Sequence, residues 1–273
     1  MDCPAAAKAG NNAAAEADLE RRFGGLRRLY GDAGYARIRA AHVVVVGVGG
    51  VGSWAAEALA RSGVAALTLI DLDHVAESNI NRQVQALGAT LGQAKVEALR
   101  LRIADIHPAC RVTPVEEFVD EGNWPGLVGG SAPDAVIDAC DQGRAKAVVA
   151  AWALATGVPL VVVGAAGGKR QAHAVALDDL ALVTHDPVLA ALRHRLRKQG
   201  RAAKTGPIGL ACVYSRESVH APAAAVAVEG SLNCHGYGSS VAVTAAFGMV
   251  AAGSAMESIA TRDQEAVAAP GYN

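Results

Sequence analysis

The chain has 273 residues and a formal net charge of −1, from 25 basic and 26 acidic side chains. Hydrophobic residues make up 52% and charged residues 19% of it, which excludes a disordered chain or a charge-driven polyelectrolyte. At about 150 residues per domain, this length predicts two domains or one large α/β domain. Aromatic residues are only 4%, and the abundance of Ala, Val and Gly favours helices packed closely on a Val-rich sheet over a β-sandwich.

Cysteine usage and the chain ends give no sign of secretion or membrane insertion. The five cysteines are Cys3, Cys110, Cys140, Cys212 and Cys234. They are odd in number, widely spaced and never form C-x-x-C, which argues against a disulfide framework and a four-thiolate zinc site. Residues 1–18 show no secretory signal, so we expect a flexible tail and a cytoplasmic protein. Residues 230–256 carry no Asp, Glu, Lys or Arg, but Asn233, His235 and many small residues favour a buried helix over a membrane span.

Strands and helices alternate through the next part of the chain. Residues 19–40 have helical spacing, interrupted by Gly24 and Gly25. The elements expected after them are a strand at 42–46, a helix that stops at Gly63, strands at 66–70, 111–115, 135–139 and 160–163, and helices at 95–106 and 145–156. This alternation predicts an α/β, Rossmann-like, doubly wound and mostly parallel sheet. We assign residues 19–168 to a nucleotide-binding core and 169–273 to an irregular, partly basic C-terminal part of the same domain.

A glycine-rich loop follows the first predicted strand. In GVGGVG, Gly47, Gly49 and Gly52 satisfy G-x-G-x-x-G between a strand and a helix, where the backbone can approach phosphates and the helix supplies N–H donors. Asp71 ends the next strand, where a carboxylate can accept hydrogen bonds from ribose hydroxyls. The alternative is a tight turn with a solvated Asp, but the complete strand, loop, helix, strand and acid order favours nucleotide binding.

Charged residues beyond the loop suit triphosphate chemistry. Arg82 and Lys95 can neutralise charge on an α-phosphate and a departing pyrophosphate, and Asp141, at a strand's carboxyl end, can hold Mg²⁺. Lys95 alone would be read as a surface charge. An NAD(P)-dependent oxidoreductase would explain the loop and Asp71 but leave these three residues without a role, as would a non-catalytic scaffold.

The order of these motifs resembles the ATP site of the ubiquitin-activating-like adenylating enzymes, which include the activators of sulfur carriers for thiamine and molybdopterin. The resemblance implies that ATP is contacted by Gly47, Gly49, Gly50, Gly52, Asp71, Asp73, Asn79, Arg82, Lys95 and Asp141. It also implies that Arg22, in a short Arg-Phe pair, matches an arginine that reaches into the partner subunit's site in a homodimer.

Longer stretches resemble one branch of this family. They are RFGGLRRLYG (22–31), VGSWAAEALARSG (51–63), NINRQ (79–83), LVVVGAAGG (160–168) and the segment around Cys234. Enzymes of that branch use ATP to activate the carboxylate of threonylcarbamoyladenosine beside the anticodon of tRNA, and the modification then cyclises with net loss of water. The resemblance covers about residues 20–260. It implies ATP and Mg²⁺ as cofactors, an adenylate in preference to a phosphate as the activated form, and tRNA, not DNA, as partner. It leaves open a monovalent cation and a cysteine desulfurase or sulfur-acceptor partner.

A basic segment without acidic residues, 187–216, fits a tRNA substrate because Lys and Arg gain affinity from phosphate contacts and counterion release. Its candidate tRNA contacts are Arg193, Arg195, Arg197, Lys198, Arg201 and Lys204. The alternative is a solvated helical face. A sulfur-carrier activator is the runner-up function, but such enzymes usually have paired C-x-x-C zinc ligands and this chain has none.

Cys234, next to His235 in SLNCHGYGSS, is the remaining candidate. A thiol beside an imidazole can be a nucleophile if its pKa falls, or it can form a polar pocket wall close to the activated carboxylate. Packing in a Gly-rich turn is an equal alternative.

Overall fold

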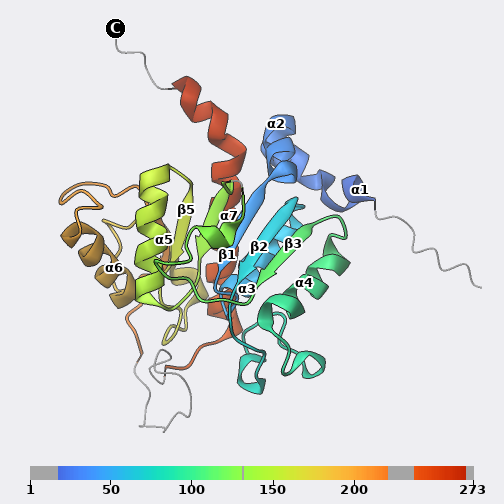
Figure 1. Ribbon diagram of the computed structural model, residues 1–273, viewed down its shortest axis with the longest axis horizontal. Coiled ribbons are helices and arrows are strands. Elements are labelled where there is room, and N and C mark those ends of the chain that lie inside the picture. Colours follow the sequence, from blue (N-terminus) through green and yellow to red (C-terminus); the bar gives the residue numbers. More distant parts are fainter. Residues whose placement is uncertain (1–17, 131, 221–236, 269–273) are drawn as a thin grey trace, which may run out of the picture.

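A seven-stranded sheet runs through the centre of the computed structural model, which describes residues 18–130, 132–220 and 237–268 (Figure 1). Its strand order is β3-β2-β1-β4-β5-β7-β6. The strands are β1 (His42–Val46), β2 (Ala66–Ile70), β3 (Arg111–Val115), β4 (Ala135–Asp138), β5 (Leu160–Val163), β6 (Val175–Asp179) and β7 (Ala211–Ser215). All neighbours pair in parallel except β6 and β7, so the predicted Rossmann-like, mostly parallel sheet is confirmed.

The helices alternate with the strands as expected. They are α1 (Leu19–Phe23), α2 (Arg27–Ala40), α3 (Gly52–Arg61), α4 (Lys95–Ile106), α5 (Gly143–Thr156), α6 (Pro187–Lys198) and α7 (Val241–Ala268). Short 3-10 turns are η1 (Gly24–Leu26), η2 (Glu77–Asn79), η3 (Gly88–Thr90), η4 (Gly126–Val128) and η5 (Ala172–Ala174). The helical stretch predicted at 19–40 is broken at η1 and again at Gly31, whose φ of 69° is outside the helical region. The C-terminal part, where periodicity is weak, supplies β6, β7, α6 and α7.

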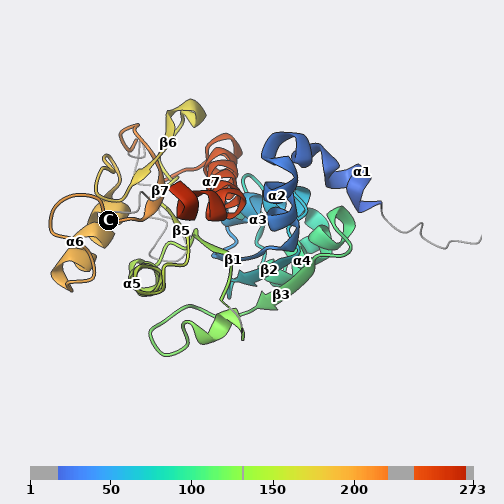
Figure 2. The same ribbon diagram turned by 90° about the horizontal axis from the view of Figure 1, so that it is seen from above.

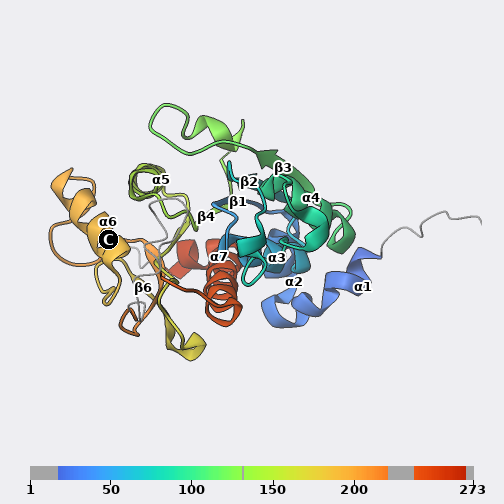
Figure 3. The ribbon, with the colours of Figure 1, turned by 90° about the horizontal axis from the view of Figure 1, so that it is seen from below.

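Helices cover both faces of the sheet (Figures 2 and 3). The helices α2, α3, α4 and α7 bury one face, and α5, α6 and a segment around Trp124 bury the other. The central strands are buried on both sides, because every residue from Val43 to Val46 is at most 2% exposed. This explains why β1 has a continuous run of valines instead of an alternating pattern.

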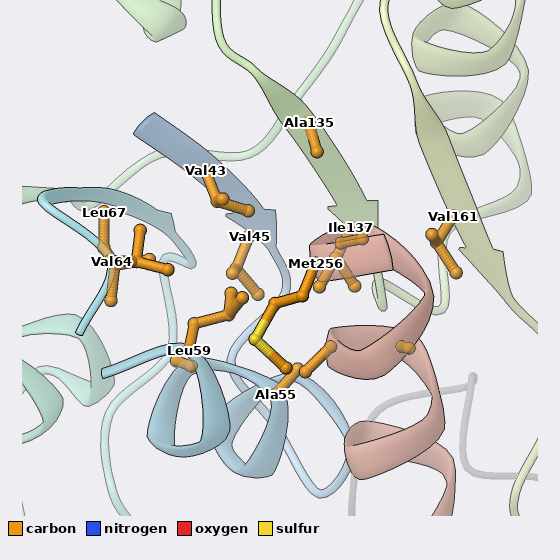
Figure 4. Close-up of a cluster of buried hydrophobic side chains, with 14 of the residues drawn as sticks. Val43, Val45, Ala55, Leu59, Val64, Leu67, Ala135, Ile137, Val161 and Met256 are labelled. Atoms are coloured by element: carbon orange, nitrogen blue, oxygen red, sulfur yellow. The ribbon is translucent and has the colours of Figure 1, made fainter. Parts of the chain in front are cut away.

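The helix α7 is apolar and long enough to cross a membrane by length and composition alone. In this structure it packs along α3 and the sheet, and Val243, Phe247, Ala251 and Ala255 have no exposed surface. Its Met256 lies beside Ala55 and Leu59 of α3 (Figure 4). Here α7 is therefore a core helix.

The sheet order reverses between β1 and β4. One half runs β1, β2, β3 outward and the other begins at β4 and β5. Ligands of open α/β sheets bind outside the carboxyl ends of the strands at such a switch point. The loop after β1 and the turn after β4 meet there.

Candidate functional site

The backbone of the nucleotide loop packs so tightly on its neighbours that two of its positions accept only glycine. Gly47 has φ of 79°, and a Cβ there would lie 2.7 Å from the Cα of Cys140 in the turn after β4. A Cβ on Gly52 would lie 1.8 Å from the carbonyl oxygen of Gly47. The helix α3 begins at Gly52, whose N–H donates to no described residue and is available to phosphate at the carboxyl edge of the sheet. The next N–H groups, those of Ser53, Trp54 and Ala55, donate to the carbonyls of Gly49 and Val51.

Asp71 follows β2 and is fixed by two backbone donors. Its Oδ2 accepts from the N–H of Val48 at 2.8 Å, and its Oδ1 accepts from the N–H of Asp73 at 2.9 Å. Burial raises the pKa of Asp71 above its usual value, while Lys95 opposes that shift. The carboxylate is thus held against the nucleotide loop and keeps lone pairs for the hydroxyls of a ribose.

Lys95 is the first residue of α4 and is almost enclosed, with 8% of its side chain exposed. Its Nζ lies 2.7 Å from Oδ2 of Asp73, whose own side chain is 60% exposed. In this structure Asp73, an expected nucleotide contact, is therefore also the partner that orients Lys95. The cation reaches the same edge of the sheet as Asp71.

Arg82 lies over the glycine loop. A Cβ on Gly50 would lie 3.3 Å from Cγ and Cδ of Arg82. Its guanidinium donates to the carbonyl of Ser78 and to Oδ1 of Asn81, both at 2.8 Å, and its own carbonyl accepts from the indole N–H of Trp54 at 2.9 Å. The structure therefore brings Arg82 to the loop, as the sequence predicts.

Asn79 also stabilises the local turn. It is 8% exposed, and its Oδ1 accepts from the N–H of Ala76 at 3.0 Å. This bond closes the η2 turn that precedes Arg82, so Asn79 shapes the segment that carries the cation.

Asp141 is exposed and lies beyond the end of β4, which stops at Asp138 and not at the predicted residue 139. The chain turns there because Oδ1 of Asp138 accepts from the N–H of Cys140 at 3.1 Å. Nζ of Lys146, from the first part of α5, lies 3.3 Å from the same oxygen. Sequence reasoning missed this buried pair. The available signal was two aspartates in IDACD followed by a lysine in the next apolar helix.

The charge state of the pair follows from its surroundings. Burial opposes the charge on Lys146, but the carboxylate of Asp138, with Asp186 farther off, outweighs it and leaves the pKa of Lys146 above its usual value. Lys146 is therefore an ammonium group at neutral pH.

One predicted catalytic residue, Arg22, is not at the loop of its own chain. Arg22 donates from Nη1 to the carbonyls of Asp105 and Ile106, at 3.0 and 2.6 Å, at the far end of α4 from Lys95. At 1.5 Å per residue, that places it roughly 16 Å from the start of the helix, so Arg22 does not reach the nucleotide loop of its own chain. Cys234 lies outside the described residues.

The basic segment divides into two groups. Arg193 donates to the carbonyls of Leu180 and Val183, each at 2.9 Å, and serves the packing of α6. Arg195 and Arg197 also donate to backbone carbonyls, those of Gly143 and Ala203. The exposed cations of this segment whose side chains make no hydrogen bond to another described residue are Lys198, Arg201 and Lys204.

The fold and the loop define a nucleotide-binding α/β protein, and the chain belongs to the ThiF family, whose model matches residues 22–271. Among its relatives, the tRNA threonylcarbamoyladenosine dehydratase of Escherichia coli K12 is 43% identical over 251 residues, which are 87% of this chain and 92% of that protein. The molybdopterin-synthase adenylyltransferase of the same organism is 37% identical over 128 residues, 47% of this chain and 51% of that protein.

Solved structures agree with this assignment. The crystal structures of the E. coli tRNA N6-threonylcarbamoyladenosine dehydratase in complex with ATP and with AMP each match with a TM-score of 0.82 at 40% identity. Each match covers 91% of this chain and 98% of that chain. The resemblance inferred from the motifs, to the family and to its tRNA-modifying branch, is confirmed.

Proposed function

We propose that the protein uses ATP to activate the carboxylate of threonylcarbamoyladenosine beside the anticodon of tRNA, and that the modification then cyclises with net loss of water. The observation that carries this proposal is the similarity to a dehydratase over nearly the whole length of both chains. The loop, Asp71, Arg82 and Lys95 support it, because they lie close together at the carboxyl edge of the sheet.

The proposed reaction has two steps. A carboxylate oxygen of the substrate attacks the α-phosphorus of ATP, and pyrophosphate leaves. The substrate's own carbamoyl group then attacks the activated carboxyl carbon, the bond to AMP breaks, and a proton is released. Lys95 and Arg82 act in the first step, since negative charge grows on the phosphates there. The second step needs no covalent bond to the enzyme, so Cys234 is given a place close to the substrate and not an obligatory role.

Asp141 is the residue proposed to hold Mg²⁺. Magnesium is usually bound through one or two carboxylates together with the phosphates of the substrate. Among the described residues no group of three His, Cys, Asp or Glu side chains could hold a metal without a nucleotide. A single exposed carboxylate next to the loop fits this mode, in which the ion shields phosphate charge. We assign no residues to a monovalent cation.

The sulfur-carrier activator is the second candidate. It shares the adenylation chemistry, but the relative of that kind aligns with about half of this chain. An NAD(P)-dependent oxidoreductase leaves Lys95 and Arg82 without a task. The proposal therefore favours tRNA as the substrate, a homodimer in which Arg22 reaches the partner's site, and the cytoplasm as the place of action.

ATP–pyrophosphate exchange, measured with and without tRNA that carries threonylcarbamoyladenosine, tests the proposal. We expect exchange that depends on the modified tRNA, with conversion of the nucleoside to its cyclic form. Exchange that ignores tRNA and responds to a carrier protein would establish the second candidate. No exchange under either condition would overturn both.

A further inference from the structure

Behind the nucleotide loop lies an ion pair that the proposed reaction does not use. Asp138 is 0% and Lys146 1% exposed in their side chains, and their Oδ1 and Nζ atoms are 3.3 Å apart. The ammonium group also donates to the carbonyl of Asp138 at 3.2 Å. Both oxygens that Nζ of Lys146 contacts therefore belong to Asp138, the last residue of β4.

The pair is connected to the nucleotide loop through one residue. Oδ1 of Asp138 accepts from the N–H of Cys140 at 3.1 Å. The N and Cα atoms of Cys140 are the atoms that a Cβ on Gly47 would meet at 2.7 Å. The turn at 139–142 therefore packs directly on the loop, and Asp141 is the residue after the contact.

Stability does not explain why a charged pair stands here. Replacing a buried ion pair with apolar groups is often neutral or stabilising, because the two charges must lose their hydration. Oδ2 of Asp138 is also buried without a hydrogen-bond partner in the described part of the chain, which adds a further desolvation cost. What the pair does provide is a fixed direction for the backbone at the end of β4.

We propose that Lys146 and Asp138 are positioning residues for MgATP. By holding the 139–142 turn against Gly47, they fix the position of the nucleotide loop. They also fix the position of Asp141 relative to the phosphates. This inference rests on the proposed function for the identity of the nucleotide.

Three variants separate positioning from folding. Asp138→Asn keeps the shape of the side chain, Lys146→Met removes the cation, and Asp138→Asn with Lys146→Met leaves no buried charge. The matched control is Arg102→Met. Arg102 of α4 forms an ion pair with the buried Glu57 of α3, with Nε and Oε2 2.7 Å apart, and this pair lies away from the loop. Each protein is assayed for its thermal midpoint, for MgATP affinity by calorimetry, and for the Mg²⁺ concentration that half-saturates exchange.

We expect the double variant to unfold within a few degrees of wild type, to bind MgATP about 10-fold more weakly and to need about 10-fold more Mg²⁺, the size typical of residues that orient a metal ligand. Arg102→Met should lower the midpoint and leave MgATP affinity unchanged. Wild-type affinity and Mg²⁺ dependence in the double variant would overturn the inference.

If the double variant does not fold, Asp138→Asn gives the same comparison. Calorimetry keeps this test separate from the proposed function, because a wild-type protein that binds MgATP but gives no exchange contradicts only the latter.

Discussion

Lys95 reaches the nucleotide site already paired and almost enclosed. Because Asp73 holds its Nζ at 2.7 Å, the proposed function would find this cation in place before charge develops on the phosphates. Lys95→Ala should therefore lower the tRNA-dependent exchange rate by about 100-fold while the thermal midpoint changes little. The matched control is Arg100→Ala on the same helix, which removes an exposed pair with Glu97 and should leave the rate intact. Near-normal turnover in Lys95→Ala would show that Lys95 is not a catalytic residue.

His107 should make the free energy of unfolding depend on pH. It is 2% exposed, its ring lies 4.7 Å from that of Phe23, and its Nε2 is 3.1 Å from a guanidinium nitrogen of Arg39. Burial, and next the charge of Arg39, hold the pKa of His107 below its usual value. In the unfolded chain a histidine titrates near 6.5, so as pH falls through about 6.5 the unfolded chain takes up this proton before the folded chain does.

Stability should accordingly be lost as pH falls below about 6.5, by at most about 1.4 kcal/mol per pH unit for this one proton. Urea unfolding of the wild type and of His107→Gln at pH 7.5, 6.5 and 5.5 measures the effect. The variant should lose less stability than wild type over the lower interval. Part of the slope will remain, since burial also lowers the pKa of His42. Equal slopes in the two proteins would show that His107 is not the group responsible.

At the scale of elements, α7 offers a matched pair of glycines. A Cβ on Gly248 would lie 2.5 Å from the carbonyl oxygen of Val51 and 2.8 Å from Cβ of Trp54, so α7 and α3 touch at this position. A Cβ on Gly253, in the same helix, would meet nothing within 4 Å. Gly248→Ala should destabilise the protein by about 1–3 kcal/mol through overpacking.

Gly253→Ala should instead stabilise it by about 0.5–1 kcal/mol, because alanine loses less backbone entropy in a helix. Chemical denaturation of both variants decides the point. Two changes of the same sign and size would mean that the α3–α7 contact is not as close as described.

The helix α6 and the loop after it should contribute to tRNA binding unevenly. The side chains of Lys198, Arg201 and Lys204 are exposed and make no hydrogen bonds to described residues, whereas the guanidinium of Arg193 donates to two carbonyls. Changing the first three together to Ala should weaken tRNA binding and reduce its salt dependence, by about one unit of slope for each phosphate that the variant no longer binds. ATP affinity should not change. Arg193→Ala should mainly lower stability, and an unaltered salt slope in the triple variant would place the tRNA surface elsewhere.

At the scale of the whole molecule, the sequence predicts the sheet because its signals are local. The valine run of β1, the loop after it and the regular alternation that follows determine a parallel sheet, and parallel strands bring Asp71 and Lys95 to one edge. The pair of Asp138 and Lys146 was missed because it depends on a sharp turn whose direction no periodicity records. A count of charges likewise cannot separate Arg193, which points back to carbonyls, from Lys198. The edge strand β6 has mixed burial and lacks an apolar run that would identify it.

Arg22 tests whether the working molecule is a dimer. In one chain it is bonded to the carbonyls at the end of α4, roughly 16 Å from the start of that helix, so any catalytic role must be played in the site of another subunit. Arg22→Ala and Lys95→Ala should each be nearly inactive. Mixed in equal amounts and allowed to exchange subunits, they should recover about a quarter of wild-type activity, because half of the dimers are then mixed and each has one site with both residues intact. If Arg22 acted in its own chain, no mixture could restore a site. Mass spectrometry shows whether mixed dimers have formed, and mixed dimers without recovered activity would contradict a dimer in which Arg22 completes the partner's site.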